Sequence, residues 1–333
     1  MVKIALDAMG GDHAPEEIVK GGLKALKENN EVVIKLVGKP ELIERFLEGK
    51  DYDKERLHLV AASEVIENEE APVAAIRRKK DSSIVRAMKL VKDKEADAFV
   101  SAGSTGAVLV GSQLVIGRLP GIHRAPLAPL IPTEKGFSLL VDCGANVDAR
   151  AAHLLQFARM GSVYMERMLG VDNPKVAIVN VGAEEEKGNA LVKESFPLLK
   201  QCREINFTGS IEAREIPKGQ ADVIVCEAFT GNVILKLYEG VGQTLLSKIK
   251  TALMSDLRSK IGALLIKPAL KRTLKAFDAS EYGGAPLLGL NGLVIKAHGN
   301  SKANEICNSI MQCIEFHEKG LHKLIRESIH SEE

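Results

Sequence analysis

VKIALDAMGGDHAP, residues 2–15, contains the pattern that decides the fold. Val2–Leu6 is a short apolar run that predicts a strand, the glycines at 10 and 11 predict a turn, and residues from about Pro15 to Lys27 have helical periodicity. The same alternation continues for most of the chain. Apolar strands separated by helices are typical of a parallel sheet covered on both faces. The sequence therefore predicts an α/β fold with a doubly wound, mostly parallel sheet.

The alternation also predicts the further elements. The predicted strands are 32–37, 57–61, 98–101, 138–141, 175–180 and 223–226, and the predicted helices are 41–47, 82–94, one after Ala149 and one after Gly188. No internal repeat, low-complexity tract or proline-rich linker divides the chain. We therefore expect residues 1–333 to form a single large α/β unit.

Composition excludes several classes of protein. The 333 residues carry a net charge of +1, only 4% are aromatic and none is tryptophan, so no surface for nucleic acid is expected. The five cysteines are odd in number and lack CxxC spacing, which indicates reduced thiols rather than disulfides or a zinc site. No signal-peptide pattern and no run of about 18 apolar residues occurs. We expect a cytoplasmic protein.

Four predicted strands end in loops of small polar residues. These loops are SAGSTGA (101–107), DCGAN (142–146), NVGAEEEKGN (180–189) and EAFTGN (227–232). Ligands of open α/β sheets bind at the carboxyl ends of the strands, glycine lets the backbone approach a ligand, and helix N-termini attract anions. Each loop alone is also explained as a tight turn between strand and helix. Four together favour a ligand site.

The motifs of several other enzyme classes are absent. The chain has no GxxxxGK[ST], HExxH or GxSxG motif, and its glycines at 240 and 242 lie within a helical pattern rather than in a dinucleotide fingerprint. No cysteine has a neighbouring histidine. We therefore expect chemistry by positioning and electrostatics, with no protein nucleophile, metal or cofactor.

Further collinear strings carry a family resemblance. They are DAMGGDHAP (7–15), RRKKDSS (77–83), SAGSTGA (101–107), LPGIHRAPLAPLIPT (119–133), DCGANVDA (142–149), NVGAEEEKGN (180–189), FTGNVILK (229–236), YGGAPLLGLNG (282–292) and IKAHGNS (295–301). On these strings the chain resembles the bacterial phosphate acyltransferases of phospholipid synthesis, the PlsX family. It departs from the family pattern at Ser104, Cys143 and Glu227-Ala228, where asparagine, valine and Asp-Gly are usual.

The resemblance implies a function and a fold. It implies direct attack of inorganic phosphate on the thioester of fatty acyl carrier protein, giving an acyl phosphate for a downstream membrane acyltransferase in phosphatidic acid synthesis. It also implies a homodimer, peripheral membrane association, no cofactor, and a fold similar to phosphotransacetylases and isocitrate dehydrogenases. Two alternatives stay open: a phosphotransacetylase or oxidoreductase on a related fold, and a scaffold that recruits acyl carrier protein without catalysis.

Combined with the strand-end pattern, the resemblance suggests site residues. Lys187 is the candidate electrostatic partner of phosphate or the thioester oxygen, Asn232 a hydrogen-bond donor, and His13 a proton shuttle or phosphate ligand. For Lys187 the alternative is a surface ion pair with its glutamate neighbours, and His298 is a weaker candidate that could instead cap or pack. The candidate phosphate- or substrate-binding residues are Asp7, Gly10, Gly11, Asp12, Gly103, Ser104, Thr105, Gly106, Asn146, Asn180, Gly182, Thr230 and Gly231.

Residues 244–277 form a basic amphipathic segment. Eight basic residues face one acid, Asp256, so the segment has a net charge of +7. Apolar residues from Leu246 to Leu264 recur at helical spacing as one stripe, and Gly262 and Pro268 predict a helix break around an apolar patch. Such a segment suits an anionic bilayer, with a packing or dimer helix and an acyl carrier protein dock as alternatives. The predicted membrane contacts are Leu264, Leu265 and Ile266.

Overall fold

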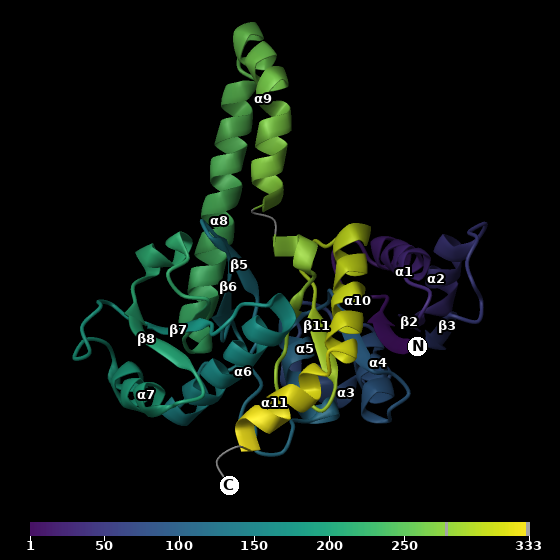
Figure 1. The fold of residues 1–333 in the computed structure, drawn as a ribbon. Coiled ribbons are helices and arrows are strands. Elements are labelled where there is room, and N and C mark those ends of the chain that lie inside the picture. The colour runs from purple at the N-terminus through teal and green to yellow at the C-terminus, as the bar shows by residue number, and fades with distance from the viewer. Residues whose placement is uncertain (277–278, 331–333) are drawn as a thin grey trace.

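The computed structural model describes residues 1–276 and 279–330 and contains two sheets (Figure 1). The first sheet has the strand order β10-β11-β4-β1-β2-β3, and only β10 is antiparallel to its neighbour. Its strands are β1 (Val2–Asp7), β2 (Val32–Gly38), β3 (Leu57–Ala61), β4 (Ala98–Ser101), β10 (Ala285–Pro286) and β11 (Leu293–Lys296).

Helices cover both faces of the first sheet. Ile4 and Leu6 of β1 pack in one hydrophobic cluster with α1 (Glu16–Glu28) and α10 (Ala303–Glu318), whereas Ala5 packs in another with α4 (Ser83–Lys92) and α5 (Thr105–Gly111). Successive side chains of a strand point to opposite faces, so this division shows that both faces are buried. The remaining helices here are α2 (Pro40–Leu47), α3 (Pro72–Arg78), α11 (Leu321–His330), a π-helical turn at Ser112–Ile116 and a 3₁₀ helix at Ala279–Tyr282.

The second sheet has the strand order β5-β6-β9-β7-β8, with β5 antiparallel and the others parallel. One face packs under α6 (Ala151–Leu169) and α7 (Ala190–Gln201), and the other under α8 (Ala228–Leu253). Its strands are β5 (Leu130–Thr133), β6 (Gly136–Val141), β7 (Lys175–Val179), β8 (Asn206–Ile211) and β9 (Val223–Val225). A 3₁₀ helix at Ala213–Lys218 follows β8.

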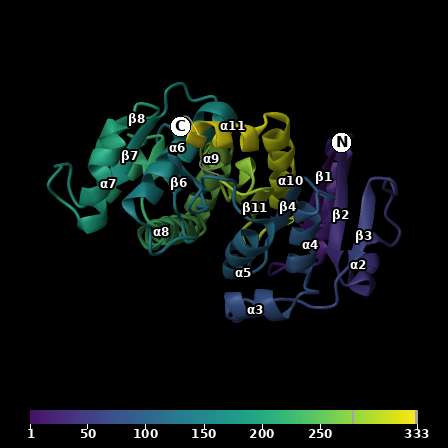
Figure 2. The ribbon, with the colours of Figure 1, turned by 90° about the horizontal axis from the view of Figure 1, so that it is seen from below.

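The two sheets occupy separate halves of the molecule, as the view from below shows (Figure 2). A single hydrophobic cluster nevertheless runs from Ile4 in the first sheet to Leu139 in the second. In addition, α11 follows the helices of the first half and packs against α6 of the second. The halves therefore share buried surface, while the expected single unit over 1–333 stays a prediction.

The predicted α/β, mostly parallel fold is confirmed, and its strands are divided between two sheets. The predicted strands are present with ends shifted by two residues or less, and the glycines at 240 and 242 lie within α8 as expected. The strands β5, β8, β10 and β11 were not predicted. Two of these four, β10 and β11, have only two and four residues, so they carry little periodicity.

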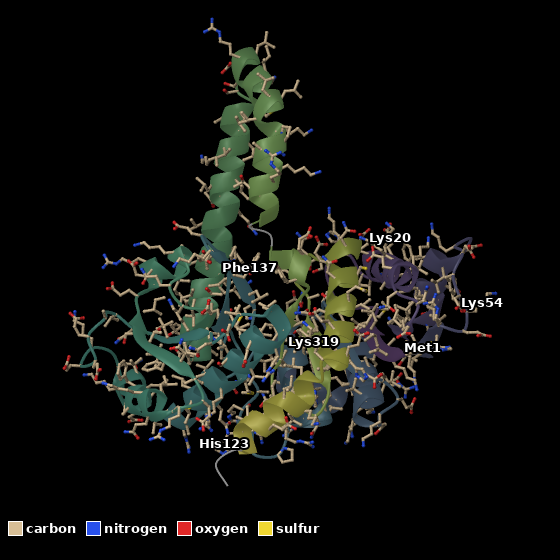
Figure 3. All side chains as sticks on the ribbon, viewed as in Figure 1. Met1, Lys20, Lys54, His123, Phe137 and Lys319 are labelled. Atoms are coloured by element: carbon tan, nitrogen blue, oxygen red, sulfur yellow. The ribbon has the colours of Figure 1, made fainter. Side chains whose placement is uncertain are left out.

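The basic segment forms most of a helical hairpin of α8 and α9 (Leu257–Ala276), which projects from the rest of the molecule (Figures 1 and 3). The predicted break between Gly262 and Pro268 is wrong, because α9 continues through both residues. The chain turns instead just before α9, where Asp256 Oδ1 accepts the backbone N–H of Ser259 at 2.9 Å as a helix cap. The end of the predicted segment, Phe277, lies outside the described residues.

This turn also divides the predicted apolar stripe between two antiparallel helices. Leu246 and Ile249 lie on α8, whereas Ile261 and Leu264 lie on α9. Within the described ranges, no helix is long and apolar enough to traverse a lipid bilayer.

Candidate active site

The loops after β1 and β4 meet at the point where the strand order of the first sheet reverses. The chain continues from β1 to β2 on one side, while β4 joins β1 on the other. Such a switch point is where open α/β sheets bind ligands. A side chain at Gly10 would bring its Cβ within 2.6 Å of the Gly103 backbone nitrogen. Glycine is therefore required for the two loops to pack backbone against backbone.

A buried carboxylate and a buried ammonium lie beneath this junction. Asp7 is fully buried, and its Oδ2 accepts the Ser101 hydroxyl at 2.6 Å. Burial raises the pKa of Asp7, while hydrogen bonds from Ser101 and Ser83 and the charge of Lys296 oppose that rise. Lys296, the last residue of β11, is 7% exposed. Burial lowers the pKa of Lys296 to about 8, with Asp7 opposing.

The loop after β11 joins the same junction. The backbone N–H of Asp12 donates to the Gly299 carbonyl at 2.8 Å, and His13 Nε2 lies 2.6 Å from Asn300 Oδ1. The side chains of Asp12 and His13 are exposed, and the charge of Asp12 acts on Lys296. Three glycine-containing strand-end loops thus converge around one lysine.

The loop after β6 is organised by a second buried carboxylate, Asp142. Its Oδ2 accepts the backbone N–H and the side-chain amide of Asn146 at 2.8 and 2.7 Å. The Asn146 amide also donates to the Ala125 carbonyl at 3.0 Å. Burial raises the pKa of Asp142, and these hydrogen bonds oppose it. The side chain of Asn146 therefore holds its loop in place.

The start of α8 packs against this loop. Glu227 caps the helix by accepting the backbone N–H groups of Phe229 and Thr230 at 2.6 and 2.9 Å, and it also accepts the Thr230 hydroxyl. A Cβ at Gly231 would overlap the carbonyl oxygen of Asp142. Only glycine lets the helix approach the β6 loop so closely.

A lysine of α8, Lys236, acts electrostatically on the buried lysine of the other half. The positive charge of Lys236 contributes to the lowered pKa of Lys296, so the two ammonium groups lie within electrostatic range. Asn232 lies one turn before Lys236 on the same helix face and is exposed. The start of α8 and the junction around Lys296 together are therefore the candidate active site.

Lys187 lies in a different loop, after β7. Its side chain is 52% exposed, and its ammonium group forms an ion pair with Glu184 at 2.8 Å, which raises the pKa of Lys187. The Asn180 amide donates to the Lys187 carbonyl at 3.1 Å, and a Cβ at Gly182 would collide with the Lys187 side chain. The structure thus contains the ion pair that was the alternative for Lys187, and its catalytic role stays a prediction.

The remaining candidates lie at the start of α5 and after β11. The Ser104 hydroxyl accepts the Ala107 backbone N–H at 3.5 Å as a helix cap, and Thr105 is exposed beside it. Gly106 leaves room for the ring of Pro72 on α3. His298 Nδ1 accepts the Asn300 backbone N–H at 3.2 Å within the loop, whereas the N-cap of α10 is Lys302. Gly11 has φ +106°, a conformation that favours glycine.

Sequence reasoning missed Lys296, Asp142 and Glu227 as organising residues. Lys296 carries the same signal as the other loops, because it ends an apolar strand and precedes Ala-His-Gly-Asn-Ser. The strand was not recognised, and its lysine was therefore not placed at the sheet edge. Asp142 and Glu227 belong to recognised strand-end loops but act through backbone N–H groups that only the folded loop brings close.

Comparisons with known proteins give the family. Residues 2–324 match the family model described as fatty acid synthesis protein. The phosphate acyltransferase of Alkaliphilus oremlandii is 52% identical over 330 residues, which cover 99% of this chain and 98% of the relative. The chain belongs to the phosphate acyltransferase family. As a member of that family it is an acyltransferase enzyme, and the family prediction is confirmed.

Solved structures confirm the fold expected of a phosphate acyltransferase. EutD phosphotransacetylase from Staphylococcus aureus superposes with a TM-score of 0.60 at 18% identity, covering 94% of this chain and 93% of that one. Isocitrate dehydrogenase from Methylococcus capsulatus gives a TM-score of 0.51 at 12% identity, covering 100% and 92%. These similarities concern the fold alone.

Proposed function

We propose that the protein transfers a fatty acyl group from the thioester of acyl carrier protein to inorganic phosphate by direct attack. The acyl phosphate formed would feed a downstream membrane acyltransferase in phosphatidic acid synthesis. The observation that carries the proposal is the Lys296 ammonium, buried within electrostatic range of Asp7 where three glycine-containing loops converge. A buried cation under loops that a ligand can approach closely suits a small anion such as phosphate.

The reaction needs positioning rather than a protein nucleophile. A phosphate oxygen forms a bond to the thioester carbonyl carbon, and the carbon–sulfur bond then breaks. The leaving thiol has a pKa of about 8.5, so it leaves as thiolate without strong acid catalysis. The proton of hydrogen phosphate ends on this sulfur, and His13 can carry it. Asn232 and Lys236 on the facing side of the site can stabilise the tetrahedral oxyanion, as preorganised donors do.

The cysteines support direct attack. Cys143, Cys226, Cys307 and Cys313 are buried, and burial raises the pKa of each thiol. Cys202 is half-buried, and burial together with its bond to Glu204 raises the pKa of its thiol as well. A reactive cysteine requires a lowered pKa. None of the five therefore has the environment of an acyl acceptor.

The decisive experiment is mass spectrometry of the products formed from acyl carrier protein thioester and ¹⁸O-labelled phosphate. The proposal expects an acyl phosphate that retains every labelled oxygen, and free carrier thiol in equal amount. A fatty acyl adduct trapped on a serine or cysteine would refute direct attack. Faster turnover with acyl coenzyme A than with the carrier would instead favour the phosphotransacetylase alternative.

We also propose a cytoplasmic enzyme that associates peripherally with membranes through the α8–α9 hairpin. Leu264 and Leu265 on α9 are 71% and 76% exposed and Ile266 is 47% exposed. Lys260, Lys267 and other basic residues of the hairpin provide the charge that anionic lipid attracts. Exposed leucines beside lysines suit the interface of an anionic bilayer.

A homodimer is proposed from the lower part of α8. Phe229, Val233 and Leu237 are exposed and follow one another at four-residue spacing, so they form an apolar stripe on one helix face. A second copy of the chain would remove this stripe from water. The stripe lies beside Asn232, so the interface would border the site.

A further inference from the structure

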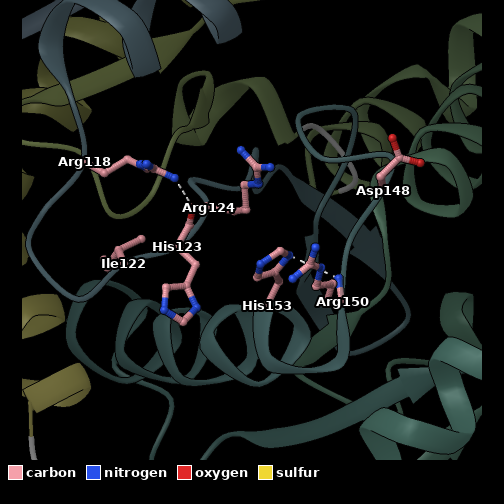
Figure 4. A pocket seen from close by; sticks show the side chains of 7 residues that line it. All are labelled: Arg118, Ile122, His123, Arg124, Asp148, Arg150 and His153. Carbon is pink, nitrogen blue, oxygen red and sulfur yellow. Dashed lines mark hydrogen bonds between the residues drawn. The ribbon is translucent and has the colours of Figure 1, made fainter.

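A basic recess lies on the surface beside the loop after β6 (Figure 4). It has a volume of about 540 Å³. Two segments distant in sequence form it: the connection from the π-helical turn to β5, and the loop that leads into α6. Its lining residues are Arg118, Ile122, His123, Arg124, Asp148, Arg150 and His153.

Positive charge in the recess is not balanced. Three arginines accompany one carboxylate, Asp148, while burial and the neighbouring arginines lower the pKa of His153, which favours its neutral form. Within the ranges that the structure describes, none of the three guanidinium groups forms an ion pair: Arg118 donates to the His123 carbonyl instead. The helix α6 begins here without an acidic residue in its first turn, so its positive end adds to the field. This arrangement is suited to an anion.

Two observations indicate which anion. Arginine guanidinium forks match the oxygens of phosphate groups in geometry and charge. The recess is, however, much larger than one orthophosphate requires and falls within the usual range for organic ligands. The buried side chain of Ile122 adds apolar surface to its wall. A phosphate group attached to an organic chain fits these properties better than a free inorganic ion.

The recess adjoins the candidate active site through short links. Arg124 precedes Ala125, whose carbonyl accepts the Asn146 amide at 3.0 Å. The Asn146 carbonyl in turn accepts the backbone N–H of Ala228, the first residue of α8, at 3.2 Å. The segments that line the recess are therefore linked by hydrogen bonds to the start of α8, which belongs to the candidate active site.

We propose that the recess binds the phosphodiester of the pantetheine arm on which the acyl donor is carried, while the attacking phosphate binds at the junction around Lys296. The inference rests on the proposed function and assigns Arg124 and Arg150 as donor-binding residues. Two separate sites would explain how the enzyme binds the attacking orthophosphate and the phosphodiester of the acyl donor at the same time, each in its own place.

The test compares three substrates in Arg124→Gln, Arg150→Gln and the double variant. The substrates are acyl carrier protein, an acyl phosphopantetheine, and the same acyl pantetheine without its phosphate. We expect the double variant to raise KM for both phosphate-bearing donors by about tenfold or more, since a charge-assisted hydrogen bond contributes that much. KM for orthophosphate and for the phosphate-free donor should not change.

Matched variants separate binding from folding. Arg167 is an exposed arginine in the last turn of α6. Arg167→Gln should leave KM unchanged for every substrate. Arg124→Lys keeps the positive charge, so its KM for the phosphate-bearing acyl donors should rise less than that of Arg124→Gln. Calorimetric titration of wild type and double variant with phosphopantetheine alone measures the recess without turnover, and binding should be lost only in the variant.

Three results would overturn the inference. A rise in KM for orthophosphate with unchanged donor values would make the recess the site of the attacking phosphate. An equal rise in KM for the phosphate-bearing and the phosphate-free acyl donors would show that the substitutions have a general structural effect. Equal titration of wild type and double variant with phosphopantetheine would show that the arginines do not bind it. Failure of the wild-type enzyme to form any acyl phosphate would refute the proposed function instead. The calorimetric titration would still show whether the recess binds phosphopantetheine.

Discussion

At the scale of single residues, Lys296 illustrates how burial tunes a binding group. Its ammonium group has lost most of its water, so its pKa falls to about 8, while Asp7 and Asp12 favour the charged form and Lys236 disfavours it. An anion that enters the site would add to the negative charge of Asp7 and Asp12 and favour the protonated lysine further. The energetic cost of burying the lysine thus becomes a preference for a negatively charged substrate.

This preference predicts a pH dependence. Below pH of about 8 Lys296 is protonated and can hold phosphate, and above that pH it loses its charge. We expect kcat/KM for phosphate to fall as the pH rises through about 8. Lys296→Arg should move that fall to higher pH, because arginine stays charged, and Lys296→Met should lower kcat/KM about 10²-fold. An unchanged alkaline limb in Lys296→Arg would exclude Lys296 as its source.

Gly231 is a residue whose size decides how two elements meet. A Cβ there overlaps the Asp142 carbonyl oxygen, so we expect Gly231→Ala to lower the free energy of unfolding by about 1–3 kcal/mol. The matched control is Gly240→Ala in the same helix, where a Cβ meets no atom within 4 Å. That change should raise the free energy of unfolding by about 0.5–1 kcal/mol. Denaturant titration of both variants measures the difference, and equal effects would contradict the packing argument.

At the scale of elements, the α8–α9 hairpin projects from the rest of the molecule (Figure 1). Leu257, Leu264 and Leu265 on α9 are exposed to water although they are large and apolar. A pair of helices that projects from the body with leucines and lysines on its surface is suited to lie at a lipid interface. The hairpin, rather than the sheets, is therefore where membrane contact should be tested.

The measurement is sedimentation with vesicles of anionic lipid. We expect Leu264→Glu combined with Leu265→Glu to remove most of the bound fraction, because two carboxylates replace apolar contact and oppose the lipid charge. Turnover with soluble substrates should persist. Leu198→Glu, a similar change on α7 away from the hairpin, is the control. Vesicle binding equal to wild type in the double variant would rule out contact through these leucines.

At the scale of the whole molecule, the two sheets and the hairpin place an open apolar stripe at the base of α8. Phe229, Val233 and Leu237 would remain in water in a single chain. We expect light scattering of the wild-type protein to give twice the mass of one chain. The double variant Val233→Glu with Leu237→Glu should shift the measured mass toward that of a single chain. A wild-type mass of a single chain at micromolar concentration would contradict the dimer.

Parts of the fold and site could be predicted because their signals are local. The strands β1 and β2 are six and seven residues long and mostly apolar, so their patterns could be recognised, and the glycine-containing segment after β1 indicated a site. The turn before α9 could not be predicted from Pro268, because a proline in an exposed helix weakens it without ending it, while the cap at Asp256 ends one helix and starts another.

The chain itself determined the alternation of strands and helices, the strand-end loops and the family, since each depends on residues close together in sequence or on rare strings. Tertiary structure alone decided that the strands divide into two sheets, that Lys296 is buried within electrostatic range of Asp7, and that Arg118, Arg124 and Arg150 share one recess. The physical reason is that burial and charge depend on neighbours in space. Those neighbours come from segments that are far apart along the chain.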